Sequence, residues 1–72
     1  MIIDSANAAE EFAQSWIREA SPSAARRAIQ RAMNDRRRML ATAKAGGRYV
    51  EALTDVRILR VFCSHLRRLP EC

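Results

Sequence analysis

The sequence predicts an all-α fold of three helices, in which the second and third form a long antiparallel hairpin and a shorter N-terminal helix packs across it. Two pairs of helix-breaking residues, Ser21-Pro22 and Gly46-Gly47, divide the 72 residues into three segments. Within each segment apolar residues recur at spacings of three and four, which is the pattern of a helix with one buried face. We therefore expect a single helical domain over residues 1–72.

The first helix is expected over about residues 5–20, with Asp4 or Ser5 as its N-cap. Its bulky apolar side chains share one face and are expected to fill the space against small side chains of the second helix: Phe12, Trp16 and Ile17. The second helix is expected over about residues 22–45, with Ser21 as its N-cap and Pro22 at its first position. Its apolar stripe begins with alanines, which allow close backbone approach: Ala25, Ala28 and Ala32.

Gly46 is predicted to end the second helix in a left-handed conformation, and the third helix is expected over about residues 48–69, just before Pro70. At 100° per residue, the third helix carries two neighbouring apolar strips. One strip holds Val56, Leu59, Cys63 and Leu66, and the other holds Ile58, Phe62 and Leu69. Because this arc is too wide for one neighbour, the third helix must be covered twice, by the second helix and by either the first helix or another chain.

The charge of the chain is unevenly distributed. Residues 1–20 carry four carboxylates and Arg18, whereas residues 21–72 carry twelve cations and four carboxylates, and the whole chain has a net charge of +5. Twelve of the 13 cations are arginines, which can bind carboxylate or phosphate in a bidentate manner. An arginine-rich codon usage explains the same composition without a ligand. The basic surface is predicted to contain Arg27, Arg31, Arg37, Arg38, Arg57, Arg60, Arg67 and Arg68.

Catalytic, metal and cofactor sites are not predicted. Cys63, His65 and Cys72 offer at most three metal ligands, and Cys63 and His65 diverge by about 200° on a helix. We expect Cys63 to be a core residue and His65 to be partly exposed. No group is placed to orient His65 as a general base, and Gly46-Gly47 lacks the strand and lysine of a phosphate-binding loop.

Arg36 lies in the middle of the apolar stripe of the second helix, where a buried charge requires a partner. Its head group is expected to reach solvent or Asp55 across the hairpin, and the alternative is a carboxylate supplied by another protein. A docking surface is predicted from Arg36 and the apolar arc of the third helix: Arg36, Ile58, Leu59, Phe62, Leu66 and Leu69.

These features favour a non-catalytic protein-interaction module that acts as a regulator, adaptor or inhibitor of another protein and forms a homodimer. In size and helical simplicity the chain resembles the small inhibitors that phages and mobile elements encode against host regulators or defence complexes. One alternative is a basic nucleic-acid-binding or transcription-regulatory protein, including a helix-turn-helix around Gly47. Another is a structural assembly subunit. The absence of a long apolar stretch predicts a cytoplasmic protein without membrane contact.

Overall fold

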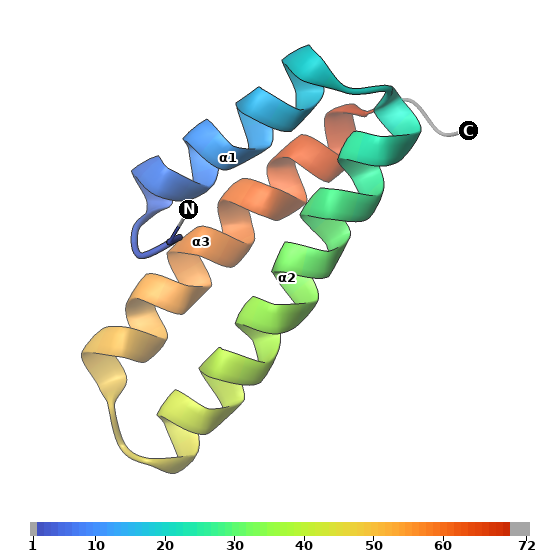
Figure 1. Ribbon diagram of the computed structural model, residues 1–72. Helices are drawn as coiled ribbons and strands as arrows, with labels where there is room; N and C mark the ends of the chain where they lie inside the picture. The colour runs from blue at the N-terminus through green and yellow to red at the C-terminus, as the bar shows by residue number, and fades with distance from the viewer. Residues whose placement is uncertain (1, 70–72) are drawn as a thin grey trace.

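The computed structural model of the chain describes residues 2–69, which form three helices: α1 (Ala6–Glu19), α2 (Pro22–Ala45) and α3 (Tyr49–Arg68). Helices α2 and α3 pack closely as an antiparallel hairpin, and α1 packs across both (Figure 1). The predicted fold class and arrangement are confirmed, and each helix end lies within one residue of its predicted position. Pro70 and Cys72, which entered the sequence analysis, lie outside the described residues.

Serine side chains begin the first two helices. The Ser5 hydroxyl accepts a hydrogen bond from the backbone N–H of Ala8 at 3.1 Å, and the Ser21 hydroxyl accepts one from the N–H of Ala24 at 3.2 Å. Each bond satisfies one of the backbone N–H groups that have no partner within the helix. Ser5 is therefore the N-cap of α1, rather than Asp4, and Ser21-Pro22 begins α2 as predicted.

The turn between α2 and α3 differs from the prediction in one residue. Gly46 has φ −86°, which any residue adopts, and it is Gly47 that takes the left-handed conformation with φ +71°. The Arg48 N–H donates to the Ala43 carbonyl at 2.9 Å and the Gly47 N–H donates to the Lys44 carbonyl at 3.2 Å. This pair of bonds is a Schellman motif, which requires the left-handed residue one position beyond the C-cap.

The core of the bundle lies where all three helices meet. Its buried apolar side chains come from α1 (Ala9, Ala13), α2 (Ile29, Met33) and α3 (Ile58, Phe62). Phe12 packs edge-to-face on Phe62, with ring centroids 6.0 Å apart and an interplanar angle of 68°. The wide apolar arc of α3 is thus covered by α2 on one side and by α1 on the other, within one chain.

Two bulky side chains of α1 are less buried than predicted. Trp16 is 38% exposed and Ile17 is 36% exposed. Trp16 lies over Ala24, Ala28 and Ala32 of α2, but a shallow groove of about 390 Å³ remains between them, so the small side chains are not fully covered. The sequence correctly predicted which face of α1 turns toward the hairpin. It overestimated how deeply Trp16 and Ile17 are buried on that face.

The helices differ in length, and this difference decides which surfaces remain open. At a rise of about 1.5 Å per residue, the 14 residues of α1 extend about 21 Å and the 24 residues of α2 about 36 Å. Helix α1 lies beside the first half of α2 and the second half of α3, so the end of the hairpin near the Gly46-Gly47 turn projects beyond it (Figure 1). That end of the bundle has two helices where the other end has three.

The two glycines of the turn provide a matched test of its geometry. We expect Gly47→Ala to destabilise the chain by about 1–2 kcal/mol, because a side chain at φ +71° crowds its own backbone. Gly46→Ala should be neutral or stabilise the chain by about 0.4–1 kcal/mol, because its φ is ordinary and the substitution restricts the unfolded chain. Urea denaturation of both variants measures the difference, and equal effects would contradict the assigned turn.

Candidate interaction surfaces

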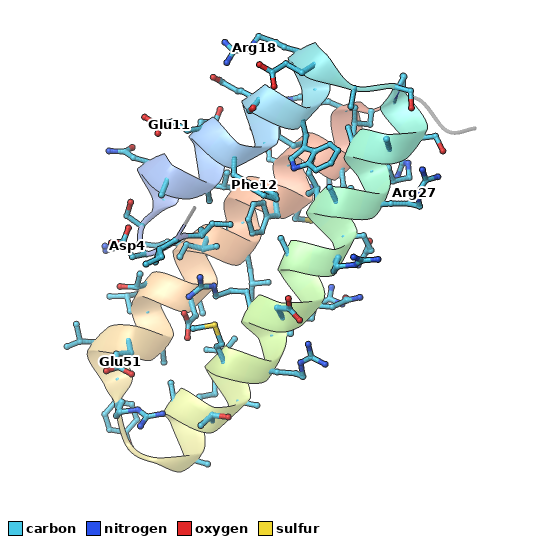
Figure 2. The ribbon with its side chains drawn as sticks, viewed as in Figure 1. Asp4, Glu11, Phe12, Arg18, Arg27 and Glu51 are labelled. Carbon is cyan, nitrogen blue, oxygen red and sulfur yellow. The ribbon has the colours of Figure 1, made fainter. Side chains whose placement is uncertain are left out.

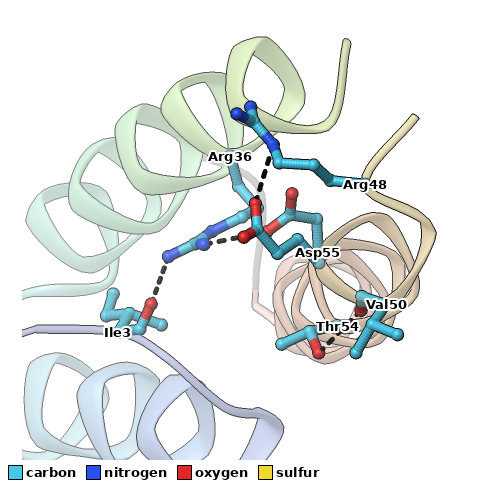
Figure 3. Close-up of polar contacts among 7 residues, drawn as sticks. Ile3, Arg36, Arg48, Val50, Thr54 and Asp55 are labelled. Carbon is cyan, nitrogen blue, oxygen red and sulfur yellow. Dashed lines mark hydrogen bonds and ion pairs between the residues drawn. The ribbon is translucent and has the colours of Figure 1, made fainter. Parts of the chain in front are cut away.

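A buried ion pair joins α2 to α3 near the open end of the hairpin. Arg36 Nη1 lies 2.9 Å from Asp55 Oδ1, and their side chains are only 11% and 6% exposed. Both residues lie on the faces that α2 and α3 turn toward each other (Figure 3). The contact to Asp55 that the sequence suggested for Arg36 is therefore present. A charge in this position is stabilised only while its partner is there, because neither group can be fully hydrated.

Arg36 also holds the N-terminal segment. Its Nη2 group donates a hydrogen bond to the backbone carbonyl of Ile3, so one guanidinium group links α2, α3 and the residues that precede α1 (Figure 3). This contact places Ile2, Ile3 and Asp4 against the hairpin beyond the beginning of α1. Arg36 is a cross-link between three parts of the chain, and its head group is already occupied.

Above this ion pair lies an open groove of about 730 Å³, which we call the end groove. Its walls are the second half of α2, the first half of α3 and the N-terminal segment, and Asp4 and Glu51 mark two of its sides in Figure 2. Three apolar side chains that line it are strongly exposed: Ile2 (84%), Met39 (51%) and Val50 (81%). The end groove occupies the space that a longer α1 would fill.

The end groove also contains every carboxylate of α2 and α3. These are Asp35, Glu51 and Asp55, and Asp4 joins them from the N-terminal segment. The lining cations pair with them: Arg36 with Asp55, Arg38 with Asp35, and Arg48 with Glu51 at 3.0 Å. Four carboxylates and three guanidinium groups leave the groove close to neutral, in a chain whose net charge is +5.

The rest of α2 and α3 carries cations but no Asp or Glu of these two helices. Nine cations of α2 and α3 lie outside the end groove: Arg26, Arg27, Arg31, Arg37, Lys44, Arg57, Arg60, Arg67 and Arg68. Arg27, for example, points outward from α2 in Figure 2. The eight arginines that the sequence assigned to a basic surface are all exposed. The exposed hairpin is thus a positively charged surface that a partner of opposite charge can approach from several sides.

The outward side of α3 combines these cations with exposed apolar side chains. Tyr49 is 76% exposed and Leu53 is 52% exposed. Arg57, Arg60 and Arg67 follow at helical spacing on the side opposite Ile58 and Phe62, and all three are exposed. We call this surface the outer α3 stripe: Tyr49, Leu53, Arg57, Arg60 and Arg67. Tyr, Leu and Arg surrounded by polar residues are a composition found in protein interfaces.

His65 and Cys63 take no part in a shared site. The His65 ring is buried, and its Nε2 lies 2.7 Å from Glu10 Oε2, so this pair joins α3 to α1. The predicted partial exposure of His65 is therefore wrong, because Glu10 and α1 cover the ring. Cys63 is partly buried and packs against the core. Among residues 2–69 no three His, Cys, Asp or Glu side chains are grouped as a metal site requires.

The docking surface predicted from the apolar arc of α3 is largely enclosed. Ile58 and Phe62 are 0% exposed and belong to the core, so they are not available to a partner. Leu59, Leu66 and Leu69 are partly buried against the same core. The physical reason is that α1 and α2 together cover the arc. Arg36 lines the end groove, where it is paired with Asp55.

Several residues that shape the exposed surfaces did not enter the predicted sites. Tyr49 and Leu53 share the spacing of Arg57 on a helical wheel, so periodicity alone would have placed them beside the predicted basic residues. Met39 and Val50 face the same groove from two helices, and their exposure depends on where α1 begins. The Glu10–His65 contact joins residues 55 positions apart and has no local signal in the sequence.

Comparison with known protein families, with characterised proteins and with solved structures finds no match. None of the helices within residues 2–69 combines the length and the apolar character needed to cross a membrane. The antiparallel packing of α2 and α3 differs from a helix-turn-helix, whose helices meet at about 90–120°.

Removing one member of the buried ion pair tests its role. We expect Arg36→Met to destabilise the chain by about 3–5 kcal/mol, because Asp55 then remains buried without its partner. The double variant Arg36→Met, Asp55→Leu should recover most of that loss, because neither buried charge remains. Urea denaturation measures both. A single variant as stable as the wild type would show that the pair contributes nothing to folding.

Proposed function

We propose that this chain is a small non-catalytic protein-interaction module that regulates, adapts or inhibits another protein by docking the outer α3 stripe on an acidic surface. The observation that supports this proposal is the placement of Tyr49 and Leu53, two exposed apolar side chains, among arginines on a helix face without carboxylates. Aromatic and arginine side chains are enriched among the residues that dominate binding energy. Surrounding arginines attract the partner and orient it.

Charge complementarity gives the class of partner. The outer α3 stripe has three guanidinium groups, and each can bind a carboxylate in a bidentate manner. Leu53 lies between Tyr49 and Arg57 along the stripe, where a partner can exclude water from it. The expected partner surface therefore has an apolar depression bordered by Asp or Glu. A helix laid into such a groove is a recurring mode of protein recognition.

The reactive side chains support the non-catalytic part of the proposal. His65 Nε2 is occupied by Glu10, and the ring is buried between α1 and α3. Cys63 lies two residues away and points to a different side of α3. The most buried carboxylate, Asp55, is bound to Arg36. Each of these three groups already has a structural role, so none of them is paired as a nucleophile with an available base.

A second candidate function is nucleic-acid binding by the cationic hairpin. The observation in its favour is the concentration of nine cations, eight of them arginine, on the part of α2 and α3 outside the end groove, where these helices have no carboxylate. Such a surface attracts phosphate regardless of sequence. The cations are distributed around both helices, however, and within residues 2–69 only Tyr49 (76%) and Trp16 (38%) are exposed aromatic side chains near them, which fits protein docking better than base stacking.

The protein-interaction proposal predicts that Leu53→Asp abolishes docking. The partner is identified by affinity capture from the native host and then purified, so that binding is measured with two defined components. We expect Leu53→Asp to raise the Kd about 30-fold or more, which corresponds to about 2 kcal/mol, because a carboxylate replaces the apolar centre and faces an acidic surface. Calorimetry or biolayer interferometry provides the measurement.

Val50→Asp is the matched control for this experiment. Val50 is also a strongly exposed apolar residue near the beginning of α3, but it lines the end groove and not the outer α3 stripe. It should leave partner binding unchanged, and circular dichroism confirms that both variants are folded. Equal binding by Leu53→Asp and the wild type would contradict the assigned surface.

The nucleic-acid candidate makes a separate prediction about salt. If the cationic hairpin binds phosphates, the chain should bind duplex DNA at about 50 mM salt and lose about 10³-fold or more in affinity by about 200 mM when six phosphates are contacted. Fluorescence anisotropy with a labelled duplex measures this dependence. Absence of binding at the lower salt concentration excludes this candidate and leaves the protein-interaction proposal intact.

A further inference from the structure

We infer that the end groove is the contact surface for a second copy of this chain, and that two copies meet there about a two-fold axis. This inference concerns a different surface from the outer α3 stripe and goes beyond the proposed function. The observation that supports this inference is a groove at the end of the hairpin that α1 does not reach. Three strongly exposed apolar side chains line it.

The apolar exposure is concentrated on facing walls of the groove. Met39 projects from α2 and Val50 from α3, and Ile2 lies on the N-terminal segment that Arg36 holds in place. These side chains are 51%, 81% and 84% exposed, respectively. Covering these exposed, neighbouring side chains with another apolar surface lowers the free energy. At the other end of the hairpin, the helix α1 covers the equivalent face of α2 and α3. A helical surface is therefore expected to cover the end groove as well.

A second hairpin fits the missing position. Where α1 is absent, α2 and α3 form a layer of two helices, and a second layer of two helices completes a four-helix bundle. A two-fold axis brings the open ends of two hairpins together in an antiparallel arrangement, with each α1 beyond the end of the other hairpin. The same residues then face each other in both copies, as an isologous interface requires.

The charge of the end groove selects a copy of the same chain over a highly charged partner. Three guanidinium groups and four carboxylates line the groove, and each guanidinium group is paired within the chain. Two such surfaces meet without strong repulsion, whereas contact between the cationic sides of two hairpins brings like charges together. The near-neutral groove offers a polyanion little attraction, because three of its four carboxylates are paired with arginines. The near-neutral end groove is therefore a surface on which two chains of net charge +5 approach each other without strong repulsion.

The size of the contact sets the expected affinity. The end groove occupies one end of a molecule whose longest dimension is 38 Å, so the interface is smaller than those of tight complexes. We therefore expect a dimer with a micromolar dissociation constant, which dissociates on dilution. Association converts two monomers of 8.2 kDa each into a dimer of twice that mass.

Sedimentation equilibrium over about 5–500 μM protein, under reducing conditions, tests the inference. The wild type should shift from monomer to dimer over this range, and Val50→Asp should weaken the dimer at least tenfold, because two carboxylates then face each other across the axis. Met39→Asp, on the opposite wall, should have the same effect. Partner binding through the outer α3 stripe should survive in Val50→Asp, so failure of one proposal is distinguishable from failure of the other.

Tyr49→Asp is the matched control. Tyr49 and Val50 are adjacent, similarly exposed and both in the first turn of α3, where an aspartate favours the helix N-terminus equally. Tyr49 does not line the end groove, so Tyr49→Asp should dimerise as the wild type does. A wild type that remains monomeric at the highest concentration overturns the inference. A Val50→Asp variant that still dimerises overturns it too, as does a Tyr49→Asp variant that loses the dimer.

Discussion

The ion pair between Arg36 and Asp55 is the contact on which the open half of the hairpin depends. In the other half, α1 supplies Ala9, Ala13 and Phe12, and the helices are joined by apolar packing. Beyond the beginning of α1 no third helix covers the seam, and the ion pair joins α2 to α3 beside the small buried residues Ala43 and Ala52. A pair that is 11% and 6% exposed remains stable there because each charge is satisfied by the other.

The same guanidinium group determines the shape of the open end. By donating to the Ile3 carbonyl, Arg36 holds the N-terminal segment beside the hairpin, and this segment forms the third wall of the end groove. An apolar residue at position 36 offers no such donor. A single arginine therefore joins the two helices beneath the groove and holds the N-terminal segment that carries Ile2.

Charge is sorted between two surfaces of this small molecule. The carboxylates of α2 and α3 all lie in the end groove, where arginines neutralise them, and the cations outside it have no carboxylate on these helices. One surface is thus nearly neutral and partly apolar, and the other is strongly positive. Surfaces of such different character attract different partners, and occupation of one leaves the other accessible.

The sequence predicted the helices well because their signals are local. Ser21-Pro22, Gly46-Gly47 and the apolar spacing are each contained within one or two helical turns, and they gave every helix end to within one residue. The Arg36–Asp55 contact was also accessible, because a charge in an apolar stripe requires a partner and a hairpin brings few candidates within reach.

The exposed surfaces were harder to predict, because exposure is a property of the whole bundle. The arc of α3 looked too wide for one neighbour, which left open whether α1 or another chain covers it, and α1 and α2 together enclose Ile58 and Phe62 completely. Conversely, Met39 and Val50 look like ordinary apolar positions of their helices. They remain exposed because α1 does not reach them, and this depends on how α1 lies against the hairpin, which no local pattern encodes.

The turn at Gly47 determines how the end groove and the outer α3 stripe are oriented relative to each other. The Schellman bonds fix the end of α2, and α3 begins two residues after Gly47 with Tyr49. Successive residues of a helix point about 100° apart, so Tyr49 faces outward while Val50 faces the end groove. Adding or removing one residue in this turn would rotate α3 by about 100° and carry Asp55 away from Arg36. The left-handed glycine therefore sets, through the register of α3, both the ion pair beneath the groove and the side chains on the outside.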